Sequence, residues 1–149
     1  MLMLYDIPVK KLNSLAKIPT KGSEKAAGWD LYAAIESSID ILPHSTIKIE
    51  TGLSFELPEG TFAGIFPRSG IATKRGLRPA NSPGVIDSDY RGNVIVALHN
   101  DTNEVQTIEP GERIAQMILL PYIATNFNIV EELTETERND SGFGDSGRF

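Results

Sequence analysis

Residues 81–94 read NSPGVIDSDYRGNV, and this stretch carries more information than any other part of the sequence. Val85 leads into Asp87, and the β-branched run at residues 94–98 is typical of a strand. An acidic, glycine-containing turn between two strand-forming segments predicts a hairpin. The hairpin would hold the carboxylate of Asp87 and the phenol of Tyr90 near one opening, which suits a pocket for a flat, polar ligand. Taken alone, the same residues also fit an ordinary turn, because Asp, Ser and Gly fill turns in most proteins.

Composition limits the class of protein. The 149 residues, 40% of them hydrophobic, are enough for one domain with a sizeable core. The chain has no cysteine, which excludes disulfides and thiolate zinc sites and fits an intracellular protein. There is no apolar run of about 20 residues and no basic, signal-like start, so we expect a cytoplasmic protein with no membrane partner. The net charge of −6 argues against nucleic acid but allows a small anion held by arginines and a divalent cation.

Short strand-like runs recur along the chain, and turn residues separate them. They lie at residues 9–12, 39–42, 46–51, 61–66, 94–98, 114–120 and 127–130. One helix is predicted from Arg68 or Ser69 to Arg75, because Pro67 precedes it and Gly76 follows it. Many short strands with one short helix predict an all-β fold, a β-sandwich, jelly roll or barrel.

The end of the chain differs in kind. Residues 134–149 read TETERNDSGFGDSGRF and hold almost no aliphatic side chains. We therefore expect a β domain at residues 1–133, followed by a Gly-rich arm at 134–149 that joins no core and is mobile without a ligand. Phe143 stands between two glycines, and a mere tail has little reason to place an aromatic ring there.

Three further polar clusters interrupt the strand-like pattern. They are AGWDL at 27–31 with Asp30, PRSGIA at 67–72 with Arg68 and Ser69, and GERIAQ at 111–116 with Gln116. The second places a cation and a hydroxyl at a helix start, where free N–H groups and the helix dipole favour an anion. Each cluster also has a plain structural interpretation: a turn acid, a helix cap, and a polar residue on a strand.

Together and in this order, the hairpin, these three clusters and the Gly-rich tail resemble the trimeric deoxyuridine triphosphate nucleotidohydrolases (dUTPases). The resemblance covers nearly the whole chain and implies an all-β, jelly-roll or sandwich fold of the dUTPase type. It is weakest in the tail, which reads RNDSGFG at residues 138–144 where the family prefers RGxGGFG. Two glycines of the family pattern are replaced and an acid is added. This departure affects closure of the tail and not the chemistry of hydrolysis.

The resemblance implies hydrolysis of dUTP to dUMP and pyrophosphate, with water attacking the α-phosphorus. This reaction limits uracil incorporation into DNA and supplies dUMP for thymidylate synthesis. By the same resemblance, Asp87 is the general base and Asp30 helps to hold Mg²⁺, through water because Mg²⁺ keeps much of its hydration shell. The phosphate-binding groups it implies are Arg68, Ser69, Gly70 and Gln116.

The remaining implied contacts concern the nucleoside and the tail. Asn81 and the backbone of Gly84, Ile86 and Asp87 would bind the uracil edge, and Tyr90 would lie under the deoxyribose. In the tail, the implied substrate contacts are Arg138, Phe143, Gly144, Ser146 and Gly147. The family forms homotrimers with shared sites, and the apolar strand at 94–98 is a plausible interface former here.

Residues 134–149 carry four acids and two arginines, a net charge of −2. This charge should oppose closure over a triphosphate unless Mg²⁺ is bound, so we predict metal-dependent ordering of the tail.

Alternative functions remain open at this stage. A dCTP deaminase shares the fold, although this chain has the phenylalanine-bearing tail of the hydrolases. A regulatory or scaffolding protein could retain the fold and bind a protein partner, and a lectin-like jelly roll is a more remote option.

Overall fold

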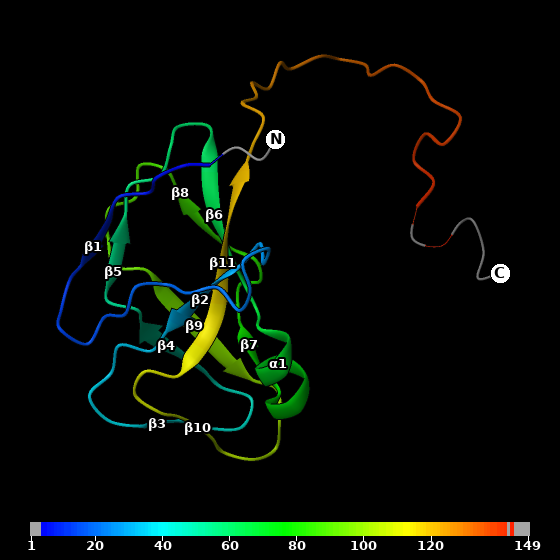
Figure 1. Cartoon of the computed structure of the whole chain (residues 1–149). Helices are drawn as coiled ribbons and strands as arrows, with labels where there is room; N and C mark the ends of the chain where they lie inside the picture. The colour runs from blue at the N-terminus through cyan, green and yellow to red at the C-terminus, as the bar shows by residue number, and fades with distance from the viewer. Residues whose placement is uncertain (1–3, 143, 145–149) are drawn as a thin grey trace.

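The structure is a computed structural model that describes residues 4–142 and 144. Within them lie eleven strands and one helix (Figure 1). In chain order these are β1 (Val9–Lys11), β2 (Trp29–Tyr32), β3 (Ile39–Ile41), β4 (Thr46–Glu50), β5 (Leu53–Phe55), β6 (Thr61–Phe66), α1 (Ser69–Arg75), β7 (Leu77–Pro79), β8 (Gly84–Asp87), β9 (Ile95–Asn100), β10 (Gln106–Ile108) and β11 (Arg113–Pro121). The all-β expectation with one short helix is confirmed.

The strands form four antiparallel sheets. The largest has the order β2-β11-β6-β8, and a three-stranded sheet has the order β4-β9-β7. Two strand pairs, β1-β5 and β10-β3, complete the framework. In the described part of the chain, no helix is long and apolar enough to cross a membrane.

The core draws on both larger sheets. Leu31 and Ile114 from the four-stranded sheet, and Val96 and Leu98 from the three-stranded sheet, are at most 1% exposed. The run at 94–98 packs its alternate residues into this core, and its expected part in an interface stays a prediction. In that run only Ile95 is substantially exposed, at 41%.

The predicted hairpin after β8 is wrong. Strand β8 pairs with β6, whereas β9 pairs with β4 and β7, so residues 88–94 connect two different sheets. The backbone explains the change of sheet. The N–H of Val94 donates to the carbonyl of Leu53 at 2.8 Å, and the carbonyl of Val94 accepts from the N–H of Thr51 at 3.0 Å. These bonds direct the chain away from β8.

The strand expected at residues 127–130 is also wrong. Strand β11 ends at Pro121, and residues 121–141 are all exposed. Phe127 and Ile129 are 99% and 98% exposed. A strand needs a hydrogen-bonding neighbour, and this segment runs away from the sheets (Figure 1). The boundary drawn at 133/134 remains a prediction.

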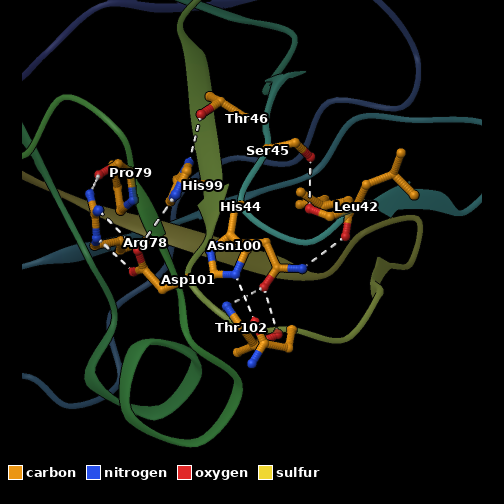
Figure 2. A network of polar contacts seen from close by, with 12 residues as sticks. Leu42, His44, Ser45, Thr46, Arg78, Pro79, His99, Asn100, Asp101 and Thr102 are labelled. Carbon is orange, nitrogen blue, oxygen red and sulfur yellow. Dashed lines mark hydrogen bonds and ion pairs between the residues drawn. The ribbon is translucent and has the colours of Figure 1, made fainter.

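A polar network holds the end of β9 to its neighbours (Figure 2). The amide of Asn100 is fully buried: it donates to the carbonyls of Ile41 and Glu104 and accepts from the N–H and hydroxyl of Thr102. The bonds of this one side chain join β9 to β3 and to the loop before β10. Both histidines of the sequence lie in the same region, where His99 contacts Thr46 and Asp101.

Candidate active site

Asp30 on β2 is the centre of the first polar group. It is 9% exposed, and both of its carboxylate oxygens are bound by arginines. The Nε of Arg68 donates to Oδ1 at 2.9 Å, and Nη1 of Arg113 donates to Oδ2 at 3.3 Å. Two cations therefore share one buried acid, which leaves a net positive charge at the start of α1. Such a group can hold an anion.

Gln116 lies beside this group, because it pairs with Asp30 across the β2–β11 ladder. Its Nε2 donates to the carbonyl of Pro67 at 2.9 Å, which fixes the amide against the segment leading into α1. The helix begins at Ser69, as predicted, and ends at Gly76 with φ 61°. Ser69 and the following glycine are exposed at its first turn.

Arg68 occupies the N-cap position but does not cap the helix. Its backbone is extended, with φ −88° and ψ 128°, and no side-chain cap hydrogen bond is made. The guanidinium instead reaches back to Asp30. The helix-cap alternative for this cluster is therefore wrong for Arg68, and the side chain belongs to the polar group.

Asp87 marks a second group, at the end of β8. It is exposed and lines an open depression of about 860 Å³ together with Phe62, Asp89, Arg91 and Tyr122. The depression lies beside the edge strand of the four-stranded sheet.

The loop around Tyr90 is held by its own backbone. The hydroxyl of Tyr90 donates to the carbonyl of Asn93 at 2.9 Å. The ring lies so close over Gly92 that a β-carbon there would overlap it. At the other end of β8, Asn81 is exposed, Gly84 is buried against Ile65, and Ile86 is half-buried.

The two groups are not brought together within one chain. Gln116 pairs with Phe66 on β6, whereas Asp87 pairs with Phe62, four residues along the same strand. Three strand spacings of about 4.8 Å and four residues of about 3.3 Å place Asp30 and Asp87 on the order of 20 Å apart. A ligand that needs both would have to take one of them from another copy.

The predicted tail residues are only partly visible. Arg138 lies in an exposed turn, where its Nε donates to the carbonyl of Ser141 at 2.8 Å. Gly144 has φ 96°. The described part of the arm, up to residue 142, extends away from the sheets (Figure 1). The other predicted tail contacts, Phe143, Ser146 and Gly147, lie outside the described residues.

The side chains of the first polar group limit how a metal ion could be held there. Within residues 4–142 and 144, no group of three or more His, Asp or Glu side chains could hold a metal. Asp30 offers one carboxylate, and both its oxygens already accept from arginines. Mg²⁺ is commonly bound by one or two carboxylates, several waters and substrate phosphates. The residues therefore fit an ion that arrives with a polyphosphate rather than one held in a protein cage.

The sequence interpretation assigned no role to Arg113. It lies three positions before Gln116, and in a regular strand the two would face opposite sides of the sheet. A register shift between Arg113 and Ala115 places the guanidinium near Asp30 instead. One indication of a role was present in the sequence: Arg113 lies in the same short motif as Gln116, at residues 111–116.

Taken together, the described chain is an all-β domain with a cationic group around Asp30 and a separate carboxylate-bearing pocket. The family model described as dUTPase matches residues 14–147. The chain therefore belongs to the dUTPase family.

Individual relatives agree with this assignment. The deoxyuridine 5'-triphosphate nucleotidohydrolase of Hydrogenobaculum sp. (strain Y04AAS1) is 43% identical over 139 residues, 93% of this chain and 96% of that protein. The protein of the same name from Desulfitobacterium hafniense (strain DSM 10664 / DCB-2) is 46% identical over 132 residues, 88% and 87% of the two chains.

Solved structures show the same fold. The dUTPase of Staphylococcus bacteriophage 80alpha with dUPNHPP superposes with a TM-score of 0.87, at 28% identity, over 97% of this chain and all of that one. A mutant dUTPase from phage phi11 of S. aureus, described with a structural Mg(II) ion, has a TM-score of 0.75 at 23% identity, over 86% and 98% of the two chains. At 23% identity, the likeness to the phage phi11 protein shows a shared fold alone.

Proposed function

We propose that this chain is a dUTP diphosphatase that hydrolyses dUTP to dUMP and pyrophosphate by attack of water on the α-phosphorus. The observation that carries the proposal is the dUTPase family match, which spans both polar groups from Asp30 to Gln116. The relatives named for this activity cover most of the chain.

The first polar group would bind the triphosphate. Arg68 and Arg113 outnumber Asp30 in charge, and the group lies next to the exposed first turn of α1. The hydroxyl of Ser69, the N–H of Gly70 and the amide of Gln116 would donate to phosphate oxygens. Donors held in place before the reaction stabilise the charge that develops on those oxygens in the transition state.

Asp87 would act as general base on the attacking water. It is exposed at the end of a strand, as a group that must accept a proton from water requires. The backbone from Gly84 to Asp87, with Asn81, would bind the uracil edge. Polar groups in such a slot reject cytosine because the wrong base leaves them unpaired. Tyr90, fixed by Asn93, would exclude a 2′-hydroxyl.

The arm would complete the site in the bound state. Phe143 would stack on uracil, while Arg138, Gly144, Ser146 and Gly147 would cover the phosphates. Ordering a loose segment costs conformational entropy, so closure depends on contacts that the substrate supplies.

Mg²⁺ fits the group around Asp30 as an ion that binds together with the substrate triphosphate. When bound, it would neutralise phosphate charge and polarise the phosphoryl oxygens. Asp30 would accept hydrogen bonds from its water shell while remaining paired with Arg68 and Arg113.

A homotrimer with shared sites, as the family resemblance implies, would account for the separation of the two groups. Asp30 and Asp87 lie on the order of 20 Å apart in one chain, so the base would act on substrate held by another copy. The exposed segment that follows β11 supports subunit contact as well: Ile123, Phe127 and Ile129 are each at least 87% exposed. Large apolar side chains in such numbers mark surfaces that another chain covers.

Pyrophosphate release from a panel of deoxynucleoside triphosphates and UTP tests the activity. Wild type should release pyrophosphate from dUTP with Mg²⁺ and turn over the others far more slowly. Asp87→Asn should lower kcat by roughly 100- to 10,000-fold while binding is retained. An intact pool of dUTP after incubation with wild type would refute the proposal, and ammonia from dCTP would favour the deaminase alternative.

Mixed trimers test the sharing of sites. Chains carrying Asp87→Asn and chains carrying Arg68→Ala are each expected to be inactive alone. If each site takes its base and its phosphate group from different copies, unfolding and refolding the two together restores activity. No recovery in verified mixed trimers would show that one chain supplies both.

A further inference from the structure

Helix α1 has little apolar packing of its own. Of its seven residues, only Ile71 has a buried side chain. The position of the helix therefore depends on the polar contacts at its two ends. At the start, Arg68 binds Asp30 of β2, as described above. The contacts at the other end have no part in the proposed chemistry.

Arg75 makes those contacts, which reach β10 and the connection from β10 into β11. Its Nη1 donates to Oε1 of Glu112, its Nη2 donates to the carbonyl of Thr107, and its Nε donates to Oε1 of Gln106 at 3.3 Å. The second oxygen of Glu112 accepts the N–H of Glu109 at 3.0 Å. The side chains of Arg75 and Glu112 are only 32% and 22% exposed, so water screens the pair less than a surface ion pair.

The position of Glu112 in the chain connects the Arg75–Glu112 ion pair to the residues proposed to bind phosphate. Glu112 immediately precedes Arg113, the first residue of β11, and the same strand carries Gln116. Arg75 thus connects the last turn of α1 to the start of β11. The helix begins beside Arg68, and β11 carries Arg113 and Gln116, the other two side chains proposed to bind phosphate. A seven-residue helix is about 10 Å long and moves as one body. A shift at Arg75 therefore changes the position of the first turn.

We propose that Arg75 and Glu112 are positioning residues for the phosphate-binding group, acting as a clamp that sets the distance between the start of α1 and Gln116. The proposal rests on the dUTPase function proposed above. Neither side chain touches the substrate. Both act through Arg68, Ser69 and Gln116, and the base-reading segment on β8 lies outside their reach.

The test compares two probes on Arg75→Gln, Glu112→Gln and the double variant. The probes are the non-hydrolysable imido analogue of dUTP, with Mg²⁺, and deoxyuridine, which has no phosphate. Each single variant should lose roughly tenfold to hundredfold in affinity for the triphosphate. Deoxyuridine should bind as it does to wild type. The double variant should be no worse than Arg75→Gln alone, since the contact with Glu112 is already lost in that variant.

Lys74→Gln is the matched control, because it removes one charge from the same helix turn at an exposed position that makes no contact with Glu112. It should bind both probes like wild type. Arg75→Lys keeps the charge but cannot reach three acceptors, so it should lie between wild type and Arg75→Gln if the more severe variants fold poorly.

Equal losses for both probes would indicate general loosening and overturn the proposal, as would additive losses or none. Failure of the proposed function looks different, since wild type itself would then release no pyrophosphate from dUTP.

Discussion

Gly28 makes room for the amide of Gln116. A β-carbon at Gly28 would overlap Oε1 of Gln116 and would stand 3.1 Å from its Cδ and 3.3 Å from its Cβ. The amide that donates to the carbonyl of Pro67 therefore occupies the space that any larger residue at position 28 would fill. A glycine that precedes the strand of Asp30 thus belongs to the polar group around Asp30 and Gln116, although it offers no polar side chain.

Gly28→Ala should lower activity more than stability. The methyl group displaces the flexible end of Gln116 and breaks its contact with Pro67, so we expect kcat/KM for dUTP to fall roughly tenfold to hundredfold. Thermal unfolding should change little, because the displaced atoms can move into solvent. Gly22→Ala is the control, since a β-carbon at Gly22 meets nothing within 4 Å. A variant as active as wild type would show that the position of this amide is unimportant.

The local elements of this fold could be predicted from sequence, whereas the pairing of the strands could not. The expected strand at 61–66 matches β6. Pro67 and Gly76, which flank the helix, indicated the position of α1 correctly. Strand partners are set by contacts distant in sequence. The segment after Tyr90 was assigned to a hairpin because its neighbours are strand formers, yet hydrogen bonds from Val94 to residues 51–53 place it in another sheet. Short strands such as β5 and β10 had no periodicity long enough to detect.

The same distinction applies to the site. Asp30, Arg68 and Gln116 were chosen from sequence motifs, and the structure places them together. Arg113 required knowledge of a β-bulge, and the separation of Asp87 from Asp30 required the register of four strands. Neither is encoded in any short window of sequence. Residue type reveals chemistry, but the three-dimensional register decides which groups lie together in one chain.

Gly92→Ala should weaken discrimination between dUTP and UTP. An added β-carbon would overlap the phenol of Tyr90 and push it off the carbonyl of Asn93. If the ring excludes the 2′-hydroxyl, as proposed, the ratio of kcat/KM for dUTP over UTP should fall by about tenfold or more, which corresponds to the loss of about 1.4 kcal/mol of discrimination.

Tyr90→Phe provides a comparison for this prediction, because it removes the same hydrogen bond without adding bulk and should have a smaller effect. An unchanged ratio in Gly92→Ala would exclude Tyr90 as the sugar filter.

Asn100→Ala should destabilise the fold without altering the chemistry. The change removes a buried amide and leaves the carbonyl of Ile41 and the N–H of Thr102 without their side-chain partner, whereas the carbonyl of Glu104 keeps the hydroxyl of Thr102. Each unsatisfied buried group costs about 1–3 kcal/mol, so we expect the free energy of unfolding to fall by roughly 3 kcal/mol in urea titrations. Asn103→Ala, in the same network but exposed, should cost less than about 1 kcal/mol. Similar losses for both would mean that burial of Asn100 is unimportant.

Ordering of the arm should depend on Mg²⁺. Residues 134–149 carry Glu135, Glu137, Asp140 and Asp145 against two arginines, so the arm approaches a triphosphate with a net charge of −2. The contacts of this segment include the local bond from Arg138 to Ser141. We expect the imido analogue of dUTP to protect the bond after Arg138 from trypsin when Mg²⁺ is present, and to protect it poorly in EDTA. Replacing both glutamates with glutamine should reduce this metal dependence, because like-charge repulsion over the phosphates is then smaller. Equal protection with and without Mg²⁺ in the unmodified chain would show that repulsion does not control closure.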